Sequence, residues 1–191
     1  MLNNGRSYWD RYRARSWHGP TGNFWQSAFQ QIGIPMFSPM TGASEFITMQ
    51  ASIPLLKNNE VVYCMEKNGA ACNKCSKCFR RAVIRNVIDD SYFSDLEEYN
   101  TSEIHKFLEK RPLYFGHIFS FARRKNSLPE WVLSRLENVP LINSDWLLKV
   151  HPYSFDFIEP PWNKILSERM KENFPFMDDE EIKSMEGWTQ E

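Results

Sequence analysis

The chain has 191 residues, and its 23 basic and 24 acidic residues leave a formal net charge of −1. A content of 42% hydrophobic and 15% aromatic residues indicates a packed globular protein and excludes a disordered polymer. The near-zero charge excludes a global field that would steer the chain to nucleic acid or membranes. No apolar run reaches the roughly 20 residues that span a bilayer, so we expect a cytoplasmic protein without membrane contact.

The front half of the chain predicts short helices and strands in alternation. Residues 23–33 have the apolar spacing of a helix that ends in glycine, and residues 34–39 predict a short buried strand. A second helix is expected to begin near Ser44 and to end before Pro54, because proline interrupts helical hydrogen bonding. The β-branched residues 60–64 (EVVYC) predict a strand that ends at the first cysteine.

The rest of the chain predicts helices almost throughout. A helix is expected over residues 75–88, followed by one capped at Thr101 or Ser102 and one that begins at Pro129. The later helical segments are TSEIHKFLEKR, LYFGHIFSFARR, LPEWVLSRLEN, SDWLLKVH, WNKILSERMKEN and DDEEIKSMEGW. We therefore divide the chain into residues 1–90, which carry the cysteine loop, and a helical region over residues 91–191.

All four cysteines of the chain lie within residues 64–78, as Cys64, Cys72, Cys75 and Cys78. A reducing cytosol disfavours structural disulfides, so a metal explains this cluster better. Zn²⁺ takes four thiolates at tetrahedral corners, and two-residue spacers let a turn direct successive thiolates to one point. Because all four ligand positions are then filled, we expect a structural zinc ion that does not activate water.

Two other roles for the cysteines compete with zinc. Ferredoxins also space three cysteines by two residues around an iron–sulfur cluster, but a proline often follows their last cysteine and Phe79 follows it here. A redox dithiol would leave two of the thiols without a role. Lys74, Lys77, Arg80 and Arg81 favour the zinc interpretation, since they would offset the formal charge of −2 on a zinc tetrathiolate.

The cysteine loop and the residues before it resemble a known family. The segments SPMTGASEFITMQ, EVVYC, ACNKCSKC and FRR occur in the order found in the C-terminal zinc knuckle of 7-cyano-7-deazaguanine synthase and related PP-loop ATP-pyrophosphatases, of the adenine nucleotide alpha hydrolase-like superfamily. The resemblance covers about residues 20–90. It implies an α/β fold, a partial Rossmann-like C-terminal half with a four-cysteine zinc knuckle and a mainly helical C-terminal extension. It also implies substrate contacts at Glu45, Arg80 and Arg81.

The part of that family's active site that binds ATP is missing from the chain. The family wraps the ATP phosphates with a Ser-Gly-Gly-x-Asp-Ser loop, and this sequence has no Gly-Gly pair. The resemblance therefore implies that an ATP-binding half acts as partner, in trans or in a longer chain, and that ATP is a cofactor only then. The complete site would be an ATP-dependent ligase or synthase that adenylates a carboxylate for attack by a nitrogen nucleophile. The sequence assigns no catalytic residue, and we expect the chain alone to be inactive.

A second hypothesis is a stand-alone zinc adaptor that binds nucleic acid or protein. Its binding segment would be residues 6–19 (RSYWDRYRARSWHG), which alternate arginines with large aromatic residues. The isoelectric point of about 6.4 makes nucleic acid the weaker expectation of the two partners. Among the histidines, we expect His105 at the surface, His117 in the core and His151 at a helix end.

Overall fold

The computed structural model describes residues 28–29, 31–33, 42–57, 64, 72–88, 95–110, 113, 115–139, 141, 143–156 and 158–186. These residues belong to two compact units. The first lies within Met1–Ile47 and Asp145–Thr189, and the second within Thr48–Ser144. The predicted division near residue 90 falls inside the second unit.

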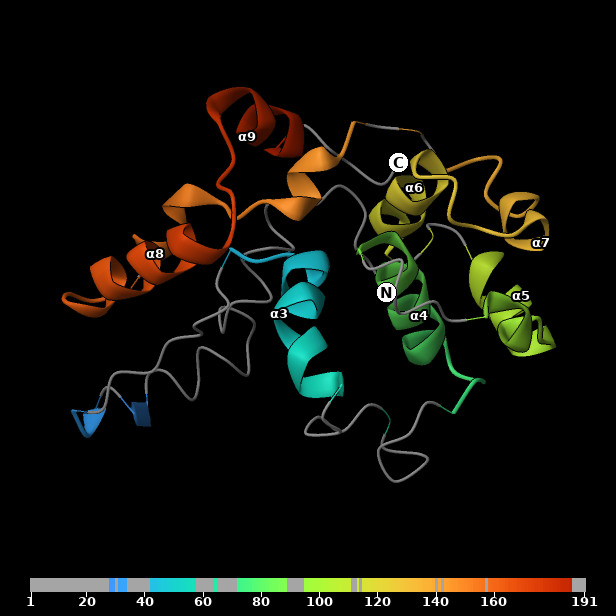
Figure 1. The fold of residues 1–191 in the computed structure, drawn as a ribbon, viewed down its shortest axis with the longest axis horizontal. Helices are drawn as coiled ribbons and strands as arrows, with labels where there is room; N and C mark the ends of the chain where they lie inside the picture. The colour runs from blue at the N-terminus through green and yellow to red at the C-terminus, as the bar shows by residue number, and fades with distance from the viewer. Residues whose placement is uncertain are drawn as a thin grey trace. The chain divides into compact units, whose positions relative to one another are not determined.

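Short helices make up the described part of the chain (Figure 1). The α-helices and 3₁₀-helices (η) are α3 (Glu45–Lys57), α4 (Ser76–Ile88), η3 (Leu96–Tyr99), α5 (Ser102–Leu108), α6 (Gly116–Arg124), α7 (Glu130–Leu133), η4 (Asp145–Leu148), η5 (Pro152–Phe155), α8 (Trp162–Asn173) and α9 (Asp179–Glu186). Before them, Ala28, Phe29 and Gln31 are helical, and Gly33 has a left-handed φ of 73°, as a terminating glycine should. None of the helices among the described residues is long and apolar enough to cross a bilayer.

The expected α/β, partly Rossmann-like fold is wrong, because the described residues form no sheet. Their one β-type pairing is an isolated parallel bridge between Val150 and Phe176. Helices pack against one another within each unit, for example α4 against α6 and α8 against η5, so neither core needs a central sheet. The two predicted strands at residues 34–39 and 60–63 lie outside the described residues, and Cys64 itself is in irregular backbone.

The start of α3 is fixed by Ser44, as the sequence predicts. Its Oγ accepts hydrogen bonds from the backbone N–H groups of Phe46 (3.0 Å) and Ile47 (3.1 Å), which is a helix N-cap. The same hydroxyl donates to the carbonyl of Leu147 and so ties the helix to η4. The predicted end before Pro54 is wrong, because α3 continues to Lys57. A proline removes one donor from the helical ladder, and here the helix tolerates that local loss.

The first unit packs η5 and α8 around a small apolar core. The buried members of this core are Ile47, Val150, Phe155, Ile158 and Met170. The segment after α8 runs beside Val150, whose N–H donates to the carbonyl of Pro175 at 2.9 Å. An ion pair of 2.6 Å between Lys149 Nζ and Glu181 Oε1 adds a contact to α9.

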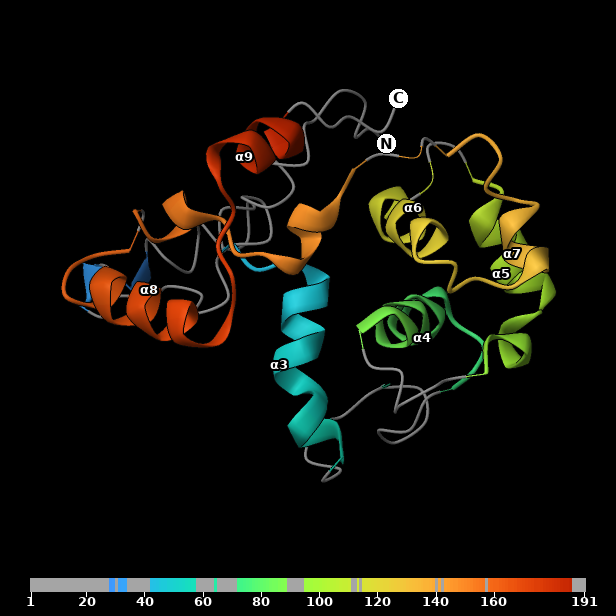
Figure 2. The ribbon, with the colours of Figure 1, turned by 45° about the horizontal axis from the view of Figure 1, so that its top comes forward.

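The second unit is built around α4, which packs against η3, α5 and α6 (Figure 2). Phe79 on α4 is fully buried, and aromatic rings from three other elements surround it. Its centroid lies 5.5 Å from that of Tyr99, 5.8 Å from that of Phe119 and 5.8 Å from that of Trp131. Aromatic rings at these separations attract one another beyond the area they bury. The start of α4 is therefore anchored in the core of this unit.

Candidate metal centre

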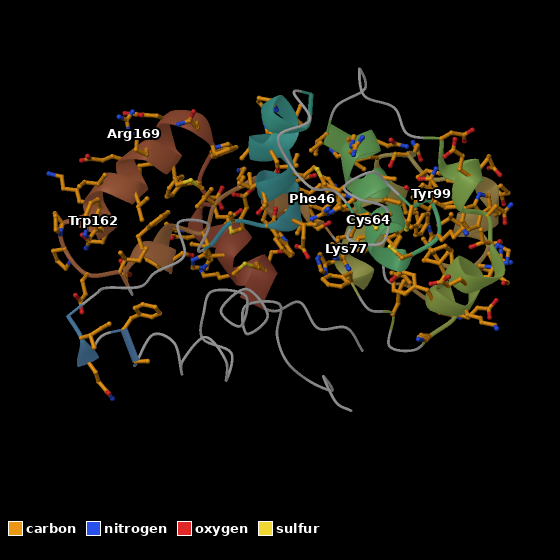
Figure 3. The ribbon with its side chains drawn as sticks, turned by 90° about the horizontal axis from the view of Figure 1, so that it is seen from below. Phe46, Cys64, Lys77, Tyr99, Trp162 and Arg169 are labelled. Carbon is orange, nitrogen blue, oxygen red and sulfur yellow. The ribbon has the colours of Figure 1, made fainter. Side chains whose placement is uncertain are left out.

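The four cysteines come together at the beginning of α4. Cys64 comes from the preceding chain, Cys72 and Cys75 from the turn before the helix, and Cys78 from its first turn. Their sulfur atoms all lie within 4.8 Å of one another, a group that can hold a metal ion. Cys64, Cys72 and Cys78 are buried and Cys75 is half-buried. Figure 3 labels Cys64 in this part of the unit.

The distances among the sulfur atoms fit a single tetrahedral ion. Sulfur atoms at about 2.3 Å from a tetrahedral Zn²⁺ are about 3.8 Å apart. The Sγ atoms of Cys72 and Cys78 are 3.7 Å apart, which matches that edge. This separation is far longer than the roughly 2.05 Å of a disulfide, and all four cysteines are free thiols. The predicted grouping of the cysteines is thus confirmed.

Backbone N–H groups point at two of the sulfur atoms. The N–H of Cys75 donates to Cys72 Sγ and the N–H of Cys78 donates to Cys75 Sγ, each at 3.4 Å. Hydrogen bonds to a sulfur favour its thiolate form, the form that binds metal. The two-residue spacers produce these bonds, because each spacer brings the next N–H back over the preceding cysteine.

Asn73 shapes the turn between Cys72 and Cys75, a role that the sequence analysis missed. Its φ of 53° is left-handed, a conformation that asparagine tolerates better than most residues. Its side-chain amide donates to the carboxylate of Glu98 in η3. The sequence did offer a signal for this conformation, because an asparagine stands between two cysteines whose spacing requires a tight turn.

The thiols differ in acidity in the metal-free chain. Burial acts to raise the pKa of Cys72, but hydrogen bonds from the N–H groups of Cys75 and Lys74 outweigh it and lower that pKa to about 6. Burial raises the pKa of Cys75 and that of Cys78 above the ordinary thiol value. A divalent cation removes the protons of coordinated thiols, so metal binding would release protons from this cluster.

The residues predicted to contact a substrate are spread over both units. Arg80 and Arg81 follow the last cysteine on α4, and the guanidinium carbon of Arg80 lies 3.6 Å from the centre of the Phe115 ring. Glu45 is the first residue of α3, in the first unit. Substrate contact by these three residues stays a prediction. The arginine-rich segment of residues 6–19 lies outside the described residues.

The fold and the cysteines define a helical protein with a candidate four-thiolate metal centre. The chain belongs to a family of unknown function, DUF6395, whose model matches residues 24–189. No curated protein and no solved structure matches the chain. The family match covers the candidate metal centre and all the residues that the structure describes.

Proposed function

We propose that the chain is a zinc protein in which Cys64, Cys72, Cys75 and Cys78 form a closed, structural tetrathiolate centre. The supporting observation is the convergence of four sulfur atoms within 4.8 Å. A soft, all-sulfur tetrahedral ligand set selects zinc or iron among the common metals. An iron–sulfur cluster would need to fit several atoms between the cysteines, whereas the 3.7 Å edge suits one ion. Zinc would join the segment that carries Cys64 to the beginning of α4.

Metal analysis of the purified chain tests the identity of the ion. We expect one zinc per chain by mass spectrometry of the metal, no visible colour, and no iron. Replacement by Co²⁺ should produce the intense near-ultraviolet thiolate bands and the visible bands of a tetrahedral site. Iron with visible absorption, or a chain that takes up no metal, would contradict the proposal.

The structural role of the ion is tested by removing a ligand. Cys75→Ser should abolish stoichiometric zinc binding and lower the melting temperature, because metal binding and local folding are coupled. Ser76→Ala is the matched control, since it changes the neighbouring residue at the start of α4 and leaves all four thiols. A Cys75→Ser chain that retains zinc and melts like the control would exclude a structural tetrathiolate.

We propose, second, that the centre is related to the zinc knuckle of the PP-loop synthases. The support is the order of features: a helix that begins after Ser44, then Cys64, then three cysteines that open α4, followed by Arg80 and Arg81. This proposal concerns the cysteine loop alone and does not include a Rossmann-like sheet. The activity it implies is ATP-dependent and requires a partner that brings the ATP-binding loop.

Nucleotide binding separates this second proposal from zinc binding alone. We expect no heat of ATP binding in calorimetry of the chain by itself, and ATP binding once an ATP-binding partner is purified with the chain from its host. Catalytic ATP turnover by the chain alone would contradict this proposal and leave the zinc proposal intact.

A further inference from the structure

The stretch that carries the metal ligands holds more positive charge than the metal centre requires. Cys72–Ile88 contains Lys74, Lys77, Arg80, Arg81 and Arg85 and no acidic residue. A zinc ion bound by four thiolates has a formal charge of −2. Within this stretch the five basic residues exceed the formal charge of the centre by three. In a chain with a net charge of −1, this is a local concentration of basic residues.

The two lysines of this stretch lie between metal ligands. Lys74 stands between Cys72 and Cys75, and Lys77 between Cys75 and Cys78; both lysines are exposed. Because the flanking cysteines turn their side chains to a common centre, the backbone at each lysine is held in a fixed conformation. Figure 3 labels Lys77 beside the part of α4 that carries the cysteines. The proposed zinc ion would thus fix the backbone from which the two lysine side chains extend into solvent.

Arg80 and Arg81 extend the charge along α4. Lys77 and Arg81 are four residues apart and so share one side of the helix. The guanidinium of Arg80 rests against Phe115, with 3.6 Å from its carbon to the ring centre. This cation–π contact orients a planar group. Guanidinium planes and aromatic rings are the groups on which proteins stack unpaired bases.

We propose that Lys74, Lys77, Arg80 and Arg81 form a binding surface for single-stranded nucleic acid, here called the basic surface. The lysines and Arg81 would contact phosphates, and Arg80 on Phe115 would stack on a base. The inference rests on the proposed zinc centre, which would fix the backbone at the two lysines. The overall charge of the chain does not predict this surface, because acidic residues far along the sequence balance it, for example Asp178–Glu181 at the beginning of α9.

Binding is measured by fluorescence anisotropy of a labelled 12-nucleotide single strand, with the zinc-loaded full chain. For a single strand, the slope of log K against log salt is about −0.7 per phosphate contact. Lys74→Glu/Lys77→Glu should weaken binding about tenfold or more at low salt and reduce the slope by about 1.4, because two contacts are lost. Arg80→Lys should weaken single-strand binding while leaving binding of a duplex competitor unchanged, since it removes the stacking plane and keeps the charge.

The matched control is Lys106→Glu/Lys183→Glu, which changes the net charge equally at exposed positions of α5 and α9. It should retain nearly full affinity. No binding by the zinc-loaded wild type, or equal weakening by the control pair, would overturn the proposal. Tighter binding of duplex than of single strand would also overturn it. Zinc content is measured on every preparation, so a failure of the metal centre is distinguished from a failure of the basic surface.

Discussion

The ring of Phe79 stacks on that of Phe119, with centroids 5.8 Å apart and planes inclined by 25°. Phe79 directly follows Cys78, so one turn of α4 carries a candidate metal ligand and the central ring of an aromatic cluster. The aromatic packing along the side of α4 fixes the rotation of this helix. The position of Cys78 therefore depends on the core of the unit, whether or not a metal is bound.

The aromatic cluster can be tested at its central member. Phe79→Ala should lower the free energy of unfolding by about 3–5 kcal/mol, because it leaves a cavity among three rings. Urea denaturation followed by fluorescence measures this change, and Phe79→Leu should lose less. We also expect weaker zinc binding by Phe79→Ala, since α4 is less well held. Equal stability of the two variants would show that the ring contacts contribute little.

Helix starts were the most predictable part of this fold. Ser44 and Thr101 begin α3 and α5 as their side chains indicate, since each accepts a backbone hydrogen bond from the first turn. The end of α3 was less predictable. Pro54 removes only one hydrogen-bond donor from the helix, so the helix can continue past it to Lys57. The class of fold was predicted wrongly, because the family resemblance rested on cysteine spacing, and a short metal loop specifies its own geometry without specifying a sheet around it.

The grouping of the cysteines was predictable because they are close in sequence. Cys72, Cys75 and Cys78 are set by one turn and one helix, so local geometry brings their sulfur atoms together. Contacts between residues far apart in the sequence could not be predicted in this way. The contact of Arg80 with Phe115 joins α4 to the residue before α6, and nothing in the spacing of either segment indicates it.

The side chain of Arg135 fixes the tautomer of His105. Its Nη2 lies 3.1 Å from His105 Nδ1, and its Nη1 donates to the carbonyl of Trp131 at 2.6 Å. Arginine can only donate, so Nδ1 accepts and the proton sits on Nε2, which donates to Asn100 Oδ1 at 2.7 Å. A double-mutant cycle with His105→Ala and Arg135→Ala should give a coupling of about 0.5–1.5 kcal/mol.

Two further measurements test this network. Nitrogen NMR of the histidine ring should show the proton on Nε2 in the native chain. Glu109→Ala is the control, because its 3.8 Å ion pair with Arg135 is exposed on the glutamate side and should contribute less than about 1 kcal/mol. A coupling of zero, or a proton on Nδ1, would contradict the assignment.

His151 should make the first unit sensitive to acid. Burial lowers its pKa to about 4, from the ordinary value of 6.5. Between these values the unfolded chain binds a proton at this residue and the folded chain does not, so the free energy of unfolding falls as the pH decreases from 6.5 to 4. The loss approaches about 3 kcal/mol and levels off below that range.

The contribution of His151 is isolated by comparing pH profiles. His151→Leu removes the titrating group and keeps an apolar side chain in the buried position. The difference in unfolding free energy between the variant and the wild type should be constant above pH 6.5. Below pH 6.5 the wild type should lose stability relative to the variant. Parallel profiles from pH 7 to pH 4 would show that the histidine takes up its proton equally in both states.

Gly42 should be hard to replace, and Gly33 supplies its control. Both have left-handed φ values, 77° and 73°. A Cβ added at Gly42 would lie 2.0 Å from Ser154 Oγ and 2.4 Å from Ser154 Cβ, whereas a Cβ at Gly33 would meet nothing within 4 Å. Gly33→Ala should therefore cost only backbone strain, about 1–2 kcal/mol. Gly42→Ala carries the same strain and must also displace the buried Ser154, which adds about 1–3 kcal/mol.

Replacing the neighbour as well separates the two costs at Gly42. In Gly42→Ala/Ser154→Gly the two serine atoms are gone and the His151 carbonyl oxygen, 3.1 Å from the added Cβ, remains. The penalty of the alanine measured in the Ser154→Gly background should therefore fall toward the value for Gly33→Ala. Thermal unfolding of the four variants measures these differences. If Gly42→Ala and Gly33→Ala were equally destabilised, the close approach of η5 to this turn would contribute nothing beyond the backbone conformation. Because the N–H of His151 also donates to the Gly42 carbonyl at 3.1 Å, we expect the larger penalty, since η5 cannot withdraw without breaking that bond.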